Sequence, residues 1–157
     1  MKCSCCGLDL GDFCIDKSFG LPDEVFAIPP VERASKVKHS DDLCQFNGKY
    51  FIRTILYIPI SNSNEAYGWG FWCEVLESDF DTYLNWYNED GSNEAPITGQ
   101  IANNIPSYPF LMGCKVSIQF GRPDQRPVSK ILKIDHPLYT EQQNGISIER
   151  VHELNEI

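Results

Sequence analysis

The residues best suited to chemistry lie at the N-terminus, where Cys3–Gly7 reads CSCCG. Cys3 and Cys6 form a C-x-x-C pair, and Gly7 follows directly. Two thiolates at this spacing can hold one zinc ion from a tight turn, and the glycine eases the backbone around the ion. One such pair supplies only half of a tetrahedral site, so the sequence predicts that other residues complete it.

The remaining ligands must come from scattered positions. The chain has no second C-x-x-C pair and no two closely spaced histidines, which excludes a zinc ribbon and a two-histidine zinc finger. His39 and Cys44 have four residues between them, a workable spacing for two ligands across a turn. Cys5 can compete with its neighbours for the ion. The residues that remain as further ligands are Cys14, His39, Cys44 and His136.

Other interpretations of the cysteines are less favoured. A redox C-x-x-C pair sits between a strand and a helix that lowers the thiol pKa, and no strand precedes Cys3. A set of free thiols near a flexible end is the simplest alternative to a metal site. Cys73 lies in an apolar strand and Cys114 begins one, so both are expected as small buried hydrophobes.

Two histidines near the C-terminus offer weaker leads. His136 shares a polar loop with Asp135 and Glu141, which could support acid–base chemistry, although a single histidine at a strand end more often satisfies backbone groups. His152 lies beside Glu149 in the last helix, and we expect it to face solvent. An enzyme is therefore not favoured.

Charge and composition limit the classes of partner and location. The 157 residues include 22 acidic and 13 basic side chains, a net charge of −9, which argues against nucleic acid and against an anionic membrane. It suits a basic protein partner or simple solubility. No targeting signal or apolar run of about 20 residues is present, and the cysteines number seven. We therefore expect a cytoplasmic protein with free or metal-bound thiols.

The pattern of elements predicts an α+β fold in a single domain, residues 1–157. Residues 1–47 are expected to be an irregular, cysteine-containing segment with a possible zinc knuckle, and residues 48–157 a body of mainly antiparallel sheet with helices packed on it. Aromatic residues in 67–72 are expected in the core. The expected strands are 49–60, 67–76, 114–120 and 128–134, with a short element at 98–101, and the expected helices are 30–37, one capped by Ser78, and one capped by Ser147.

The chain resembles the bacterial family called domain of unknown function 2199. The resemblance rests on an ordered set of motifs: Cys3-x-x-Cys6-Gly7, Asp42-Leu43-Cys44 before Tyr50–Arg53, Trp69–Trp72, Asp135–Leu138, Glu141-Gln142 and Gly145-Ile146. It implies a bacterial, cytosolic, single-domain protein and brings no activity or catalytic residue. It also makes Cys3, Cys6, Cys44 and His136 the natural set of four zinc ligands, while Cys5 and Cys14 are departures that leave the assignment open.

Three functions are consistent with these observations. The favoured one is a domain that binds one structural zinc ion and acts as a binding or interaction protein. The second is an immunity or inhibitor protein that neutralises a basic partner such as a toxin, which the acidic charge suits. The third is a metal-dependent enzyme that uses His136 and Glu141. The sequence leaves the oligomeric state open.

Overall fold

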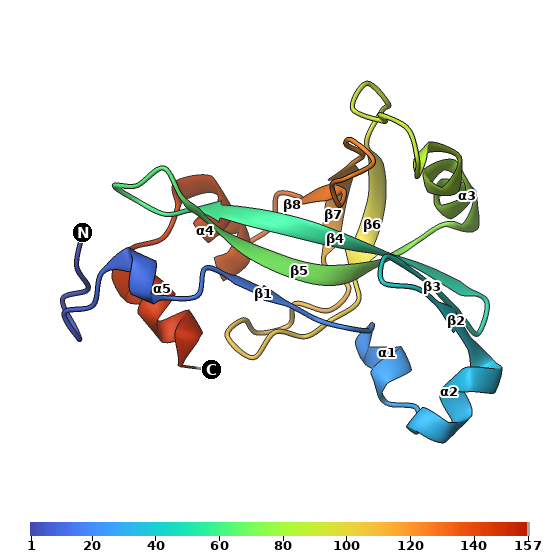
Figure 1. Cartoon of the computed structure of the whole chain (residues 1–157), viewed down its shortest axis with the longest axis horizontal. Coiled ribbons are helices and arrows are strands. Elements are labelled where there is room, and N and C mark those ends of the chain that lie inside the picture. The colour runs from blue at the N-terminus through green and yellow to red at the C-terminus, as the bar shows by residue number, and fades with distance from the viewer. Residues whose placement is uncertain (157) are drawn as a thin grey trace.

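A long antiparallel hairpin forms the centre of the computed structural model, which describes residues 1–156 (Figure 1). Its strands are β4 (Lys49–Pro59) and β5 (Ala66–Val75), paired without interruption from Tyr50 opposite Val75 to Pro59 opposite Ala66. Both strands are dense in β-branched and aromatic residues, which suit a pleated and largely buried surface. This hairpin confirms the clearest strand prediction of the sequence.

Five strands close into a barrel. From β5 the sheet continues antiparallel through β6 (Ile97–Ile101), β7 (Lys115–Gln119) and β8 (Val128–Ile131). Strand β8 then pairs with β4 in parallel, where Val128 lies opposite Ile55. Because β4 also pairs with β5, the ring is complete, and the mainly antiparallel α+β fold predicted from the sequence is confirmed.

Three short strands from the first 47 residues extend this sheet. β1 (Asp16–Ser18) runs parallel to β5, and β2 (Val37–His39) with β3 (Leu43–Phe46) forms a hairpin beside β4. The N-terminal segment is therefore more regular than its sequence suggests. Gly70 shows why β1 can pair there: a Cβ at this position would lie 2.7 Å from the Cβ of Ser18. The glycine permits this close approach.

Helices cover the barrel and its extensions. The predicted helices at 30–37, after residue 76 and after Ser147 are present, but Ser78 lies inside its helix and does not cap it. The helix α4 was not predicted, because His136-Pro137 was expected only to end a strand; Pro137 instead occupies the first helical turn. The helices are η1 (Leu10–Asp12), α1 (Asp23–Phe26), α2 (Pro30–Lys36), α3 (Glu77–Trp86), α4 (Pro137–Asn144) and α5 (Ile148–Asn155).

The aromatic residues of β5 are in the core, as predicted. Tyr67, Trp69 and Phe71 belong to the main cluster of buried side chains. Trp72 points to the other side of the strand and packs with Val25, in a second cluster beneath α1. Within the described residues, no helix combines the length and the apolar character needed to cross a membrane.

Candidate metal centre

A tight N-terminal loop presents the first cysteines. The amide of Gly7 donates to the carbonyl of Cys3 at 2.8 Å, and the amide of Cys3 donates to the carbonyl of Leu8 at 2.8 Å. Gly7 has a φ of 76°, a left-handed conformation that glycine adopts at little cost. The loop therefore has the glycine-assisted turn that the CSCCG segment predicts, with the side chains of residues 3–6 projecting from it.

Helix α5 presents a histidine to this loop. Ser147 caps the helix by accepting from the amide of Arg150 at 3.1 Å, and Ile148, Val151 and Leu154 are buried. This apolar face fixes the rotation of the helix, and His152 lies at its edge with 19% of its side chain exposed. The ring of Phe13 stacks on the imidazole with centroids 5.6 Å apart. The expectation that His152 simply faces solvent was wrong.

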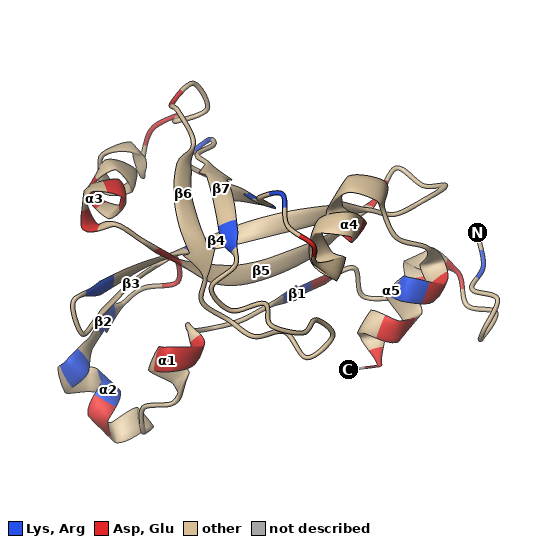
Figure 2. Ribbon diagram, turned by 180° about the vertical axis from the view of Figure 1, so that it is seen from behind, with Lys and Arg blue, Asp and Glu red and all other residues tan. Residues whose placement is uncertain are grey.

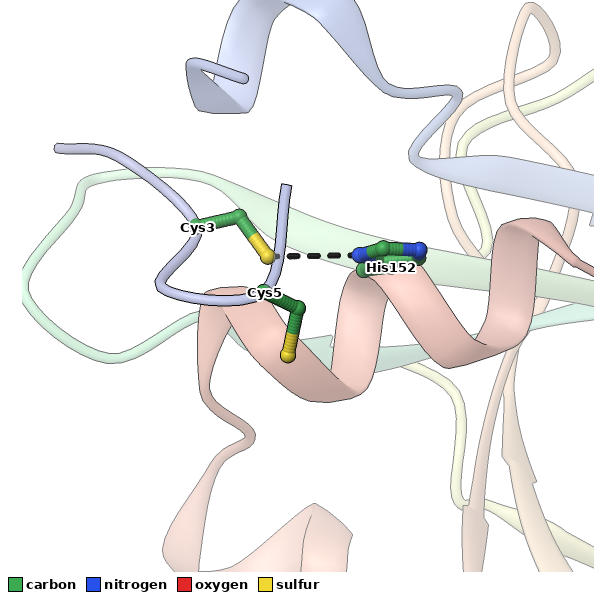
Figure 3. A group of neighbouring side chains, drawn as sticks. All are labelled: Cys3, Cys5 and His152. Carbon is green, nitrogen blue, oxygen red and sulfur yellow. Dashed lines mark hydrogen bonds between the residues drawn. The ribbon is translucent and has the colours of Figure 1, made fainter. Parts of the chain in front are cut away.

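The two elements bring three ligand groups together. Cys3 Sγ lies 3.3 Å from His152 Nδ1 (Figure 3). Ligand atoms of Cys3, Cys5 and His152 all lie within 4.8 Å of one another, close enough to hold a metal ion. Zn–S bonds of about 2.3 Å and Zn–N bonds of about 2.0 Å place neighbouring tetrahedral ligands about 3.5–3.8 Å apart. Small side-chain adjustments would therefore bring all three groups to a single zinc ion.

The surroundings of Cys3 favour its thiolate, which is the form that binds metals. The residue as a whole is 2% exposed, and loss of contact with water raises the pKa of its thiol. Hydrogen bonds outweigh this effect and lower the Cys3 pKa from 9.0 to about 7. They come from the His152 side chain, from the backbone of Cys5 and Cys6, and from the Cys6 side chain. The hydrogen bond to Cys3 in turn raises the pKa of His152. Each residue therefore favours the charged form of the other, thiolate for Cys3 and imidazolium for His152.

The other ring nitrogen of His152 is also engaged. His152 Nε2 donates to Oε1 of Glu156 at 2.6 Å, one turn further along the chain. Histidines that bind metals commonly donate their second ring N–H to a carboxylate, which fixes the tautomer and strengthens the ligand nitrogen. The bond to Glu156 leaves Nδ1 as the nitrogen that faces the two thiols.

The third cysteine of the same loop lies beside this group but is not part of it. The Cys6 side chain is exposed and hydrogen-bonds to Cys3. The pKa of the Cys5 thiol is raised, mainly by desolvation and to a smaller extent by the neighbouring charge of Cys3. A cation between these sulfurs would favour thiolates at both positions, since a coordinated thiol loses its proton.

The other predicted ligands lie elsewhere in the fold. Cys44 is fully buried in the cluster beneath α1, opposite His39 in the β2–β3 hairpin, and burial raises its pKa to about 11. The Cys14 thiol donates to the carbonyl of Asp16 at 2.9 Å. Within the part of the chain that the structure describes, these residues do not join Cys3 in a group of three metal-binding side chains.

His136 and Glu141 have structural roles. His136 caps α4: its Nδ1 accepts from the amide of Leu138 at 3.0 Å, so Nε2 carries the proton and donates to the carbonyl of Pro109 at 2.6 Å. Glu141 accepts from Tyr108 at 2.5 Å and from Arg150 at 2.8 Å. Both histidine nitrogens and both carboxylate oxygens therefore have hydrogen-bond partners within the fold.

The contribution of His152 was missed because its partner lies 149 positions away in the sequence. One local signal does exist. His152 follows Ile148 by four residues, so the two share one side of the helix, and Ile148 is 4% exposed. A histidine in line with a buried isoleucine is placed at the edge of the packed face rather than in open solvent.

The comparisons place the chain in one family. A family model described as an uncharacterised protein conserved in bacteria, DUF2199, matches residues 2–146. The match includes the cysteine loop and ends before His152. No curated protein and no solved structure matches the chain.

Proposed function

We propose, from the premise that the chain belongs to the bacterial family DUF2199, that it is a small zinc-binding domain whose metal is structural. The ion would be held by Cys3, Cys5 and His152, with Cys6 as the fourth ligand. It would fasten the N-terminal loop to helix α5. The domain around it would act as a binding or interaction protein in the bacterial cytoplasm, where reducing conditions suit seven unpaired cysteines.

One observation carries this proposal: three metal-binding side chains from opposite ends of the chain converge within 4.8 Å. The two ends also lie on the same side of the molecule in Figure 1. They are already joined by a pair of bonds, in which the side-chain amide of Asn155 donates to the carbonyl of Cys14 at 2.8 Å and accepts from its amide at 2.9 Å. A metal ion would add a strong link to an interface that the fold has prepared.

The donor set favours zinc over harder cations. Thiolates and imidazole bind zinc readily, whereas magnesium and calcium prefer oxygen ligands. Three cysteines and one histidine form a common closed tetrahedral site for structural zinc. The proposed ligands that would supply this set are Cys3, Cys5, Cys6 and His152.

A nucleophilic role for Cys3 is the second candidate, because a specific arrangement favours it. Cys3, His152 and Glu156 follow the order thiol, imidazole, carboxylate that activates a cysteine nucleophile. A substrate carbon must reach the sulfur, and only 2% of Cys3 is exposed. The amides of Cys5 and Cys6 point at the sulfur itself, where they support a thiolate or a metal–sulfur bond. The geometry is therefore better suited to a structural ion.

Metal content tests the proposal. Protein purified under reducing conditions is examined by native mass spectrometry and elemental analysis, as wild type and as Cys3→Ser, Cys5→Ser and His152→Ala. We expect one zinc per wild-type chain and loss of most of it in each variant. Cys14→Ser is the matched control, since Cys14 is a cysteine of the same N-terminal segment outside the cluster, and it should retain zinc. Wild-type protein that binds no zinc even when zinc is supplied would refute the proposal.

A further inference from the structure

A surface depression on the barrel lies between apolar side chains. Met112, Leu132 and Ile134 line it and are 44%, 40% and 45% exposed. Its volume is about 550 Å³, enough to receive several side chains of a partner. The residues come from the segment before β7 and the segment after β8, so the depression belongs to the barrel and not to the cysteine cluster.

The loop before β7 also displays an unusual aromatic residue. Phe110 is 93% exposed, and its φ of 50° is left-handed, a conformation that bulky residues rarely adopt. Its carbonyl accepts from the thiol of Cys114, a residue that lines the depression, at 3.5 Å. Strain of this kind persists where the surrounding structure enforces it, and it clusters at binding sites.

Unpaired positive charge surrounds the apolar residues. Lys115 and Lys133 line the depression, and Lys130 is exposed on β8, two residues before the lining residue Leu132. Among the described residues, the lysines whose side-chain ammonium makes no hydrogen bond or ion pair are Lys38, Lys115, Lys130 and Lys133. Two of these four, Lys115 and Lys133, therefore line the same depression, and Lys130 is close to it in sequence. No acidic side chain lines the depression.

This grouping stands out on an acidic molecule. The chain carries 22 acidic residues, and Figure 2 shows them on helices α1, α3 and α5 among other places. Elsewhere the basic residues are mostly paired with carboxylates, as Lys49 is with Glu24 and Arg126 with Asp42. Lysines that are left unpaired around apolar side chains are complementary to a ligand that is both apolar and negatively charged.

We propose that this depression is a docking site for a short acidic amphipathic peptide segment of a partner protein. Apolar side chains of the segment would enter between Met112, Leu132 and Ile134. Its carboxylates would face Lys115, Lys130 and Lys133.

The distance over which electrostatic interactions act favours a small ligand. At physiological ionic strength, charges are screened beyond about 8 Å. A short segment therefore senses the lysines beside it. A nucleic acid, an anionic membrane or a second copy of the chain would extend over more of a surface whose net charge is −9, and repulsion would oppose it.

A peptide selection tests this proposal. A library of short random peptides on phage is selected against the full chain, and the enriched peptides are then measured by fluorescence anisotropy. We expect enrichment of sequences that combine Asp or Glu with large apolar residues. The double variant Lys115→Glu/Lys133→Glu should weaken their binding about tenfold or more, and added salt should weaken binding to the wild type.

Two further variants test whether binding depends on this depression or only on the overall charge of the protein. Lys38→Glu reverses an equally unpaired lysine on β2 and should leave peptide binding unchanged. Ile134→Ser removes an exposed apolar contact and should weaken binding, with circular dichroism used to confirm that the variant is folded. Enrichment of basic or uncharged peptides, no enrichment, or equal binding by the Lys115→Glu/Lys133→Glu variant would overturn the proposal.

Other occupants would give different results. A dimer that forms with increasing concentration in analytical ultracentrifugation and is lost in Ile134→Ser would show that a second copy occupies the depression. Binding to phosphatidylserine vesicles that is lost in Lys115→Glu/Lys133→Glu would show that it is a lipid-binding surface. Either result would overturn the peptide proposal.

Discussion

His152 and Cys3 are the pair on which the account of the metal centre depends. Each changes the protonation of the other: the Cys3 pKa falls to about 7, and the His152 pKa rises. Part of each shift is local, from Cys5 and Cys6 for Cys3 and from Glu156 for His152, but the contribution that each makes to the other exists only after the chain has folded. The pair gives two predictions at the scale of single residues.

The first prediction concerns pH. Protons compete with zinc for every ligand atom, so affinity should fall as the solution becomes more acidic. Above pH 7 the Cys3 thiol is mostly deprotonated already, and below pH 7 zinc must displace its proton. The raised pKa of His152 acts in the same direction, since its ring holds a proton at higher pH. Zinc affinity can be measured by competition with a chromophoric chelator at about pH 6, 7 and 8. It should fall about tenfold per pH unit for each ligand that becomes protonated.

The second prediction concerns thiol reactivity. In zinc-loaded protein, an alkylating reagent should modify Cys14, which is exposed and outside the cluster. Cys44 and Cys73 should resist, because burial raises their pKa values to about 11 and about 12. Removal of zinc should add Cys5 and Cys6 to the modified set, as read by peptide mass spectrometry. Equal labelling of Cys5 with and without zinc would argue against its role as a ligand.

At the scale of elements, α5 is the support of the metal centre. Its rotation is set by the buried face of Ile148, Val151 and Leu154, and its start is set by Ser147. The start at Ser147 was predicted from the sequence, since a serine before a helical pattern is a strong local signal. The helix was therefore predictable, while the direction in which its histidine points depended on where the N-terminal loop would lie.

Removal of the cap gives an element-scale prediction. Ser147→Ala should lower the free energy of unfolding by about 1 kcal/mol, because the amide of Arg150 loses its partner. Fraying of the first turn should also weaken zinc binding by a smaller factor than His152→Ala does. Urea unfolding and a zinc titration measure the two effects. Ser147→Asp restores a capping oxygen and should keep most of the stability; a loss equal to that of alanine would contradict the capping role.

The strands show the limit of sequence reasoning more clearly than the helices. The hairpin of β4 and β5 was evident from β-branched and aromatic residues, and β7 from its alternation. Strands β1, β2 and β3 were not, because they have only three or four residues and owe their conformation to neighbours such as Gly70. Helix α4 was missed because Pro137 was expected to end a strand, whereas β8 already ends at Ile131 and Pro137 begins the helix.

At the scale of the whole molecule, the group of Cys3, Cys5 and His152 brings the two ends of the chain together. Residues near the start also bond to the last helix directly, as Lys17 does to the carbonyl of Leu154 at 2.6 Å. The ligand set inferred from the sequence drew on Cys44, which lies in β3, and on His136, which caps α4. Cys3 alone among the favoured four lies in the cluster that could hold an ion, with Cys6 beside it.

Chelation of zinc should therefore destabilise the whole domain. A ligand at a hundredfold excess over its dissociation constant stabilises the folded state by about 2.7 kcal/mol. For a chain of this size, that corresponds to a decrease in Tm of roughly 5–10 °C when the metal is removed. Hydrogen exchange should increase in the cysteine loop and in α5. The His152→Ala variant should show no further change on chelation, and an unchanged wild-type Tm would contradict a structural role.

The most direct test of the central claim is the zinc K-edge X-ray absorption spectrum of the purified protein, which reports the atoms bound to the metal. The account predicts a four-coordinate ion with sulfur neighbours at about 2.3 Å and one nitrogen neighbour at about 2.0 Å. The nitrogen contribution should disappear in His152→Ala. A spectrum with only oxygen neighbours, or one unchanged by His152→Ala, would contradict the assignment of Cys3, Cys5 and His152 as the metal centre.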